Sequence, residues 1–540
     1  MDAKFPQAAN HVGQCSFVLL VFAAIMCLAF AAQAQEVCVT PDRINELKAA
    51  FSSQKTDPQN PELKSEILQM KSDLATLSTP QSQDKSASPS PEQTQKAAQR
   101  MCAILKSEPW PSKTTVGEDG ASAWIRLVKT YFSPQLQVAL LPVISAGVER
   151  DQIKKDGELA SLIDRLRLRA GVPQIFGTQA VANNGFIVIS PLYSAEQVDA
   201  LRAEYGIAPL RDYIRALQSS YQMPVIWSPI RPAHVAVKAE TAKPENGSGL
   251  LQMGNDDNDV VTVNTSLVTI DATVFGQNVP DLTKSDFKIF EDGKPQDISV
   301  FSSPKSPFDI ILLLDLSGST AEKLGLIKKT TKNFIEMKRD VDRLGIVTFS
   351  DKQTVVSPLE SDKEKLFDSV SKIKDFGGSW VWDAEKFALD MLQRDSKPDR
   401  RKAIVVMTDG NDNALTYEPG AGSKVLFADL VEEVRNNSIA IFPIYLDTQG
   451  PGELNARMYT DARRTLQLLA DESGGNYYTT KDIGKLSEVY ERVLRDVGRV
   501  YSLGYEPTNA KRDGSWRTIK VEIPSHPEIK VRARPGYYAK

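Results

Sequence analysis

At three places in the sequence, side chains with hydroxyl or carboxylate oxygens directly follow an apolar stretch or a glycine pair. Residues 315–319 read D-x-S-x-S, Ser379 follows two glycines, and Asp409 lies inside a Thr-Asp-Gly sequence. Hydroxyl and carboxylate oxygens, without thiols or imidazoles, are the ligands that hard cations such as Mg²⁺ and Ca²⁺ prefer. The sequence therefore predicts a metal site with the ligands Asp315, Ser317, Ser319, Ser379 and Asp409.

Few of these ligands are charged, which affects how an ion would behave there. With only Asp315 and Asp409 ionised, a bound cation keeps much of its Lewis acidity and at least one position that is open or filled by water. A carboxylate of another molecule could fill that position. The alternative for the serines is structural, because Ser317 or Ser319 could cap a helix that begins near Ala321.

The residues around this set predict the elements that position it. Between Asp309 and Arg499, continuous apolar runs alternate with amphipathic helical patterns. Such runs are typical of parallel strands that helices cover on both faces, and these sheets bind ligands at the carboxyl ends of their strands. The predicted fold class is α/β, with a doubly wound, mostly parallel sheet. The predicted strands are residues 310–314, 344–349, 403–407 and 439–445.

Two-residue periodicity flanks this region on both sides. Residues 260–303 are rich in β-branched side chains, and residues 287–301 read as a hairpin around an Asp-Gly turn. Strand patterns return at residues 500–505, 517–523 and 529–533. Because isolated hairpins are rarely stable in water, we expect both flanks to pair into one β unit with the α/β domain inserted between them.

The ordered set of motifs resembles the von Willebrand factor type A domain and its metal-ion-dependent adhesion site, over roughly residues 305–500. The resemblance implies that Ser317, Ser319 and Ser379 ligate the ion directly, and that Asp315 and Asp409 act directly or through water. It implies Mg²⁺, with Ca²⁺ or Mn²⁺ as alternatives, and a protein partner that offers an Asp or Glu carboxylate. The family usually has threonine where this chain has Ser379, and serine keeps the oxygen.

The flanks resemble those of a bacterial subgroup of secreted proteins that carry this domain. The subgroup has a D-F-x-x-F-E-D-G-x-x-Q strand before the domain, here residues 286–296, and an R-x-G-Y tail after it, here residues 534–537. Near the predicted site, Trp380 and Trp382 follow Ser379. They would form a partner-contact rim if exposed. The alternative is that Trp382 lies in the core and Trp380 caps the sheet.

The N-terminus has the layout of a secretory signal. An apolar stretch at residues 15–30 precedes Ala32-Gln33-Ala34, an A-x-A cleavage pattern, and an uncleaved membrane anchor is the alternative. Cleavage predicts a protein that is secreted or located in the periplasm or cell envelope. It would leave Cys38 and Cys102 in an oxidising compartment, where we expect a disulfide rather than two free thiols.

The predicted domains divide the chain as follows: signal peptide 1–34; helical segment and low-complexity linker 35–95; mainly helical domain 96–230; linker 231–258; β unit 259–304 plus 500–540; type A domain 305–499. Parts of the helical domain resemble an uncharacterised bacterial family without known activity. Its polar residues could line a binding site, or could hold a small fold together. These residues are Asp164, Arg165, Gln174 and Gln179.

Composition narrows the function. The net charge of −4 argues against nucleic-acid binding, and three histidines leave little for a histidine metal cluster or a Ser-His-Asp relay. The chain has no G-x-S-x-G, H-E-x-x-H or G-x-x-x-x-G-K-[ST] sequence. We therefore expect a non-enzymatic, metal-dependent binding module. A structural envelope protein with a purely stabilising ion, and a hydrolase, are the alternatives.

Overall fold

The structure is a computed structural model that describes most of the chain after the predicted signal. The described residues are 38–51, 60–76, 90–195, 197–228, 267–276, 279–317, 323–374, 377–397, 400–409, 412–415, 422–447 and 456–539. The predicted signal peptide, the 231–258 linker and Ser319 lie outside them. Contacts divide the chain into two compact units, of which the first is Met1–Val181 with Ile189–Ile214 and the second is Ala182–Val188 with Arg215–Lys540.

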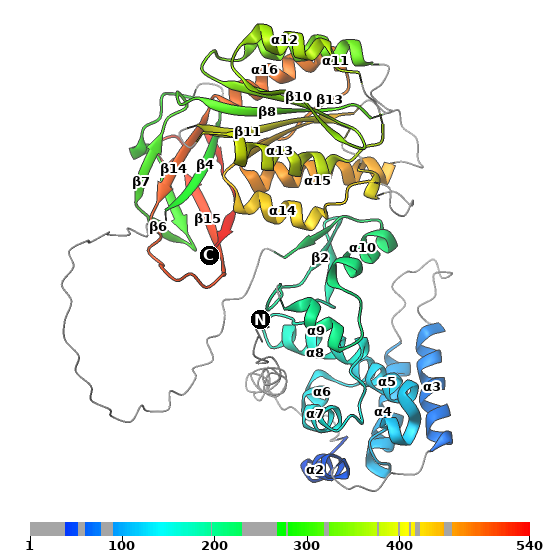
Figure 1. The fold of residues 1–540 in the computed structure, drawn as a ribbon. Helices are drawn as coiled ribbons and strands as arrows, with labels where there is room; N and C mark the ends of the chain where they lie inside the picture. The colour runs from blue at the N-terminus through cyan, green and yellow to red at the C-terminus, as the bar shows by residue number, and fades with distance from the viewer. Residues whose placement is uncertain are drawn as a thin grey trace, which may run out of the picture. The chain divides into compact units, whose positions relative to one another are not determined.

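The first unit is mainly helical, as expected (Figure 1). Its helices begin at side chains that suit this position: Ser90 forms a capping box with Gln93, and Asp156 accepts the N–H groups of Glu158 and Leu159. The helices are α2 (Pro41–Ala50), α3 (Pro61–Thr76), α4 (Pro91–Ser107), α5 (Lys113–Tyr131), α6 (Pro134–Ala139), α7 (Leu141–Glu149), α8 (Gly157–Arg169), α9 (Val198–Glu204) and α10 (Leu210–Tyr221), the last of which continues into the second unit.

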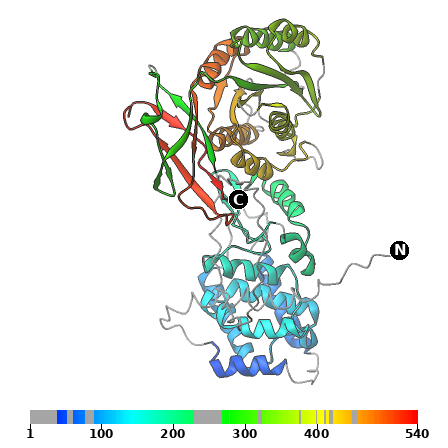
Figure 2. The ribbon, with the colours of Figure 1, turned by 60° about the vertical axis from the view of Figure 1, so that its left-hand side comes forward.

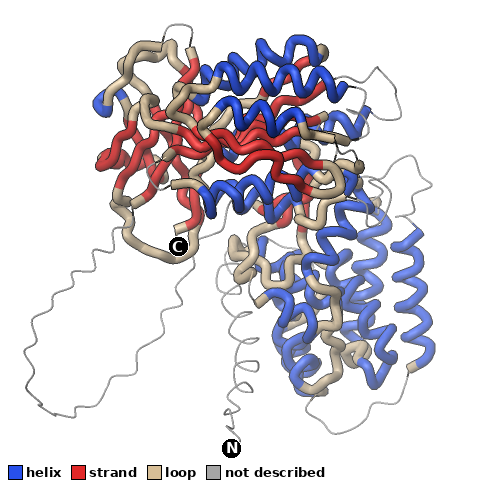
Figure 3. Tube along the Cα trace, turned by 45° about the horizontal axis from the view of Figure 1, so that its top comes forward, coloured by secondary structure: helices blue, strands red, loops and turns tan. Residues whose placement is uncertain are grey.

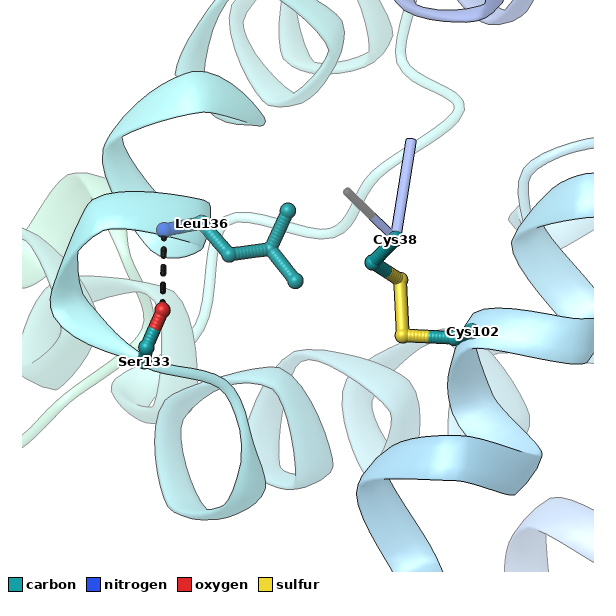
Figure 4. The surroundings of a disulfide bond; sticks show 4 residues. All are labelled: Cys38, Cys102, Ser133 and Leu136. Carbon is teal, nitrogen blue, oxygen red and sulfur yellow. Dashed lines mark hydrogen bonds between the residues drawn. A yellow bond between two sulfur atoms is a disulfide. The ribbon is translucent and has the colours of Figure 1, made fainter. Parts of the chain in front are cut away.

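A disulfide joins Cys38 to Cys102, with their Cα atoms 5.3 Å apart. The bond ties the segment before α2 to α4, and the side chain of Leu136 points toward it (Figure 4). The pairing expected from the two cysteines is therefore present. Nearby in the same core, the rings of Trp110 and Trp124 meet edge to face at 6.2 Å.

The polar residues of the first unit satisfy local main-chain groups. Asp164 is fully buried and accepts N–H bonds from Ile175 and Phe176 at 2.8 and 3.0 Å. Gln174 donates to the carbonyls of Gln179 and Ser190. These bonds hold the turn after α8 in place, which favours the structural alternative for this set.

A six-stranded sheet forms the core of the second unit. Its order is β10-β9-β8-β11-β12-β13, and all neighbouring pairs are parallel except β10 with β9. This confirms the predicted α/β class, although the sequence analysis did not identify β10 or β13. The strands are β8 (Phe308–Asp315), β9 (Arg343–Phe349), β10 (Gln353–Glu360), β11 (Arg401–Thr408), β12 (Ala440–Leu446) and β13 (Tyr478–Thr480).

Helices cover both faces of this sheet (Figures 1 and 3). One face carries α11 (Leu324–Met337), α12 (Lys363–Ser371) and α16 (Leu486–Val497), and the other carries α13 (Val381–Asp395), α14 (Phe427–Asn436) and α15 (Ala456–Ser473). The central strand β8 is buried at every residue, as a strand between two helical layers must be. The described part of the unit also contains the short 3₁₀ turns η1 (Lys284–Asp286), η3 (Asn413–Leu415) and η5 (Ile483–Lys485).

The two flanks pair into one β unit, as expected (Figure 2). Its two four-stranded sheets have the orders β16-β4-β14-β7 and β17-β15-β5-β6. Asp292 and Gly293 have φ values of 48° and 77°, which is the conformation that a two-residue hairpin turn needs. The strands are β4 (Val268–Phe275), β5 (Lys288–Glu291), β6 (Lys294–Gln296), β7 (Ile298–Ser302), β14 (Val500–Tyr505), β15 (Trp516–Glu522), β16 (Lys530–Arg532) and β17 (Gly536–Tyr538).

The inserted domain enters after β7 and leaves into β14, and these two strands are antiparallel neighbours. Arg401 links the two junctions. Its guanidinium donates to the carbonyls of Pro304 and Ser306, each at 2.7 Å, and to the carbonyl of Val500. One side chain therefore fastens both ends of the insertion.

A fourth, small sheet has the order β1-β2-β3, with β1 (Ala180–Asn183), β2 (Phe186–Ile189) and β3 (Val225–Trp227). Phe186 stacks on Phe427 of α14 with ring centroids 6.3 Å apart, and both residues belong to the second unit. Of the helices in the described ranges, none is both long and apolar enough to cross a membrane.

Candidate metal centre

The predicted ligands lie at the carboxyl edge of the central parallel strands. In the sheet register, Leu314 of β8 stands opposite Met407 of β11, and Asp315 stands opposite Phe349 of β9. Because the three strands run in the same direction, the residues that follow them emerge at one edge. Asp315 and Asp409, although distant in sequence, are brought together there.

Asp315 is held from two sides. It is fully buried; Oδ1 accepts the N–H of Ser317 at 2.8 Å and Oδ2 accepts the hydroxyl of Thr408 at 2.6 Å. Burial, and then the negative charge of nearby Asp409, raise the pKa of Asp315 above its ordinary value. Two carboxylates in a buried place repel each other, so a cation between them would relieve the repulsion.

The loops that carry Ser317 and Ser379 are tied to the sheet edge by main-chain contacts. Ser317 forms an isolated parallel bridge with Gly377, and Leu316 donates its N–H to the carbonyl of Phe349 at 2.9 Å. A Cβ atom at Gly377 would lie 2.8 Å from Oδ1 of Asp351, so only glycine fits there without displacing that side chain. Close packing against Asp351 therefore favours glycine at position 377.

Ser379 is the residue whose environment suits a bound ion most clearly. The side chain is 6% exposed, and among the described residues its buried Oγ has no hydrogen-bond partner. Its main chain, in contrast, is fixed, because the carbonyl accepts the N–H of Asn413 at 3.0 Å. A buried hydroxyl without a partner costs free energy, and a cation would satisfy it. The donor set therefore fits a hard cation.

Sequence reasoning missed two residues that organise the site. Thr408 orients Asp315, as described above. Asp412 is fully buried and accepts the N–H groups of Trp382, Ala414 and Ser423 at 3.0, 2.8 and 3.0 Å. It connects the start of α13 to the loop after β11. Its position three residues after Asp409 was the only signal in the sequence.

The prediction of a tryptophan rim is wrong for Trp382. This residue is 1% exposed, and its ring packs against Phe427 at 5.2 Å within the core under α13. Trp380 is half-buried, with Nζ of Lys424 5.6 Å from its ring centre. Of the five predicted ligands, Asp315, Ser317, Ser379 and Asp409 lie at this edge of the sheet. No group of three His, Cys, Asp or Glu side chains suited to a metal occurs in the described part of the chain.

Two family models match the chain. Residues 309–492 match the von Willebrand factor type A domain, and residues 87–226 match a family of unknown function, DUF6624. The chain thus contains a von Willebrand factor type A domain, which is a protein-interaction module, and an N-terminal DUF6624 region. Domains of this type commonly bind a divalent metal at the adhesion site and are generally not enzymes.

Solved structures also resemble the chain. A von Willebrand factor type A protein from Catenulispora acidiphila is 14% identical, with 49% of this chain and 75% of that chain covered and a TM-score of 0.31. The von Willebrand factor domain of the type V pili tip protein Mfa5 from Porphyromonas gingivalis is 12% identical, with coverage of 36% and 95% and a TM-score of 0.28. Proximal thread matrix protein 1 from the mussel byssus, solved with a zinc-occupied MIDAS motif, is 19% identical, with coverage of 38% and 49% and a TM-score of 0.29.

Proposed function

We propose that the type A domain of this protein binds a protein partner through a divalent cation. The ligands are Asp315, Ser317, Ser319, Ser379 and Asp409, and the ion is Mg²⁺, with Ca²⁺ or Mn²⁺ as alternatives. When bound, the ion supplies a positive charge with an open coordination position. An Asp or Glu carboxylate of the partner fills that position.

The observation that carries this proposal is the buried Oγ of Ser379, which has no hydrogen-bond partner in the described part of the chain. The paired carboxylates of Asp315 and Asp409 support it, because their repulsion makes the metal-free site unfavourable. The buried serine and the repelling acids both call for a cation, and they lie at the edge where parallel sheets bind ligands.

Partner contacts would extend beyond the ion. Trp380 lies next to Ser379 in sequence, is half-buried, and carries the cation of Lys424 over its ring. An aromatic residue with a neighbouring positive charge suits an acidic partner segment. We therefore place Trp380, without Trp382, in the contact rim.

The protein would act outside the cytoplasm, after cleavage behind Ala34. The disulfide between Cys38 and Cys102 supports this, since such bonds persist in oxidising compartments. N-terminal sequencing of the protein from its source would then begin at Gln35. A sequence that begins at Met1 would contradict the cleavage.

Titration calorimetry with Mg²⁺ and with Mn²⁺ tests the site directly. The full chain should give saturable binding, Asp409→Ala should give none, and Glu336→Gln should behave like the parent chain. Glu336 is exposed on α11, so this control removes one negative charge from the same domain away from the site. Equal ion binding in all three proteins would refute the proposal.

The partner step needs its own test. A protein captured from an envelope fraction in Mg²⁺ should be released by EDTA and should not be captured by Asp409→Ala. Capture that persists in excess EDTA would leave the domain as an interaction module but would exclude the metal-dependent mechanism. Ion binding that raises only the melting temperature, with no metal-dependent capture, would favour the structural alternative.

A further inference from the structure

A cavity of about 480 Å³ lies where the β unit meets the end of α14, within the second unit. Its walls come from the start of β4, the turn between α14 and β12, the loop after β14, and the C-terminal strand β17. None of the four predicted ligands that the structure describes, Asp315, Ser317, Ser379 and Asp409, lines it.

Every charged side chain that lines this cavity is a cation. The four are Lys511, Arg512, Arg517 and Arg534, and no acidic residue in the described part of the chain lines it. Arg517 is paired with Glu291, whose Oε1 lies 3.2 Å from the guanidinium. In a chain whose net charge is −4, this cavity gathers four cations, of which Arg517 is already paired.

Arg534 lines the cavity and is 8% exposed. Its guanidinium donates to two main-chain carbonyls, those of Thr269 at 2.8 Å and Arg435 at 3.3 Å, while Nε is buried and has no partner among the residues that the structure describes. Within the described ranges, no carboxylate forms an ion pair with it. Burial lowers the pKa of Arg534, and the nearby charges of Tyr505 and Asp271 offset only part of that effect.

The walls of the cavity are pre-formed. The guanidinium of Arg517 donates to the carbonyls of Asn509 and Lys511, and so holds the loop that carries the two exposed cations. Behind it, the buried carboxylate of Glu291 accepts the hydroxyls of Tyr505 and Tyr537 at 2.7 and 2.8 Å. A site built on such fixed groups loses little conformational entropy when a ligand binds.

We propose that this cavity binds a small oxyanion with more than one negative charge, either a phosphate or a polycarboxylate. Arg534 supplies a buried charge, and Lys511 and Arg512 supply exposed charges. The volume suits a compact ligand. Glu291, Arg534 and Tyr537 belong to the two flanking motifs, which the metal site does not use, so the cavity gives these motifs a role.

Calorimetry on the full chain tests this, with inorganic phosphate and citrate as probes at constant ionic strength. The variant Lys511→Gln with Arg512→Gln changes two exposed loop residues and should fold normally. Its matched control is Lys288→Gln with Lys294→Gln, which removes two exposed lysines from the same β unit outside the cavity. We expect the loop variant to bind at least about tenfold more weakly, which corresponds to about 1.4 kcal/mol.

The two probes distinguish the ligand classes. Saturable binding of phosphate alone identifies a phosphate site, and binding of citrate alone identifies a polycarboxylate site. No saturable binding of either probe, or equal binding by the parent, loop-variant and control proteins, overturns the proposal. Asp409→Ala should leave oxyanion binding unchanged, so failure of the metal site and failure of this cavity are independent results.

Discussion

The hydroxyl of Thr408 donates to Oδ2 of Asp315 over 2.6 Å, across a sequence separation of 93 residues. The residue immediately before one predicted metal ligand therefore orients another. Thr408 is fully buried, so this bond is not shared with water. It couples the carboxyl ends of β8 and β11.

Removing that hydroxyl should weaken the site without removing a ligand. We expect Thr408→Val to lower the free energy of unfolding by about 1–3 kcal/mol, because a buried acceptor loses its donor. Mg²⁺ affinity should fall about tenfold, which corresponds to 1.4 kcal/mol. Thr408→Ser keeps the hydroxyl and should restore most of the affinity. Calorimetry and thermal denaturation measure both effects, and unchanged affinity in Thr408→Val would contradict the orienting role.

The repulsion between Asp315 and Asp409 should be visible without metal. In EDTA we expect the free energy of unfolding of Asp409→Asn to exceed that of the parent chain by about 1 kcal/mol. This gain in stability should be largest at high pH, where both carboxylates are ionised. It should shrink as the pH falls, because the raised pKa of Asp315 means that Asp315 is protonated at a higher pH than an ordinary carboxyl group. Denaturant melts at several pH values measure this. A variant less stable than the parent in EDTA would show that the two charges do not oppose folding.

Glu385 on α13 makes a second pH-dependent contribution. It is fully buried, neither carboxylate oxygen has a hydrogen-bond partner in the described part of the chain, and burial followed by the charge of Asp412 raises its pKa well above the ordinary value. A carboxyl group with a raised folded-state pKa binds more protons when folded, so stability falls as the pH rises above the unfolded pKa.

Glu385→Gln should therefore stabilise the protein at pH 8 by at least about 1 kcal/mol, since one pKa unit is worth 1.36 kcal/mol. The gain should disappear near pH 4, where both proteins are neutral at this position. Glu364→Gln, exposed on α12, is the control and should change little. A loss of stability at pH 8 would mean that the ionised carboxylate has a favourable partner.

The disulfide should matter for the first unit. Cys38 and Cys102 are 64 residues apart, so the chain-entropy model gives about 4 kcal/mol of stabilisation. We expect Cys38→Ser with Cys102→Ser to speed amide hydrogen exchange in α2 and α3, while the strands of the type A domain keep their protection. Hydrogen-exchange mass spectrometry reports each segment separately. Unchanged exchange in α2 would show that packing of Leu47 and its neighbours holds that helix without the bond.

The long apolar strands of the sheet could be predicted because each is buried on both faces and therefore reads as a continuous hydrophobic run. β10 escaped prediction because Gln353–Glu360 is an edge strand that contains Pro358 and has only one fully buried residue, Ser357. β13 has three residues, too few for a periodic pattern. Both strands form through pairing with a neighbour that the local sequence does not encode.

Part of the candidate site could be predicted from local sequence signals, whereas the rest depends on contacts between distant segments. Asp315, Ser379 and Asp409 follow predicted strands or a glycine pair, and this local signal is visible in the sequence. The roles of Thr408 and Asp412 depend on which side chains they face across the fold. The burial of Trp382 likewise depends on Phe427, which lies on a separate helix.

Two adjacent strands, rather than a single linker, connect the inserted domain to the β unit. β7 and β14 run side by side, and Arg401 bonds to the chain at both junctions. The candidate metal centre lies at the carboxyl end of β8. This end is roughly 25 Å from the start of the strand, which has eight residues. A force exerted by a bound partner at this site would be transmitted along the central strand β8 to both connections, β7 and β14. The backbone bonds of the β unit would then share the mechanical load, and the domain could not swivel freely about one point of attachment.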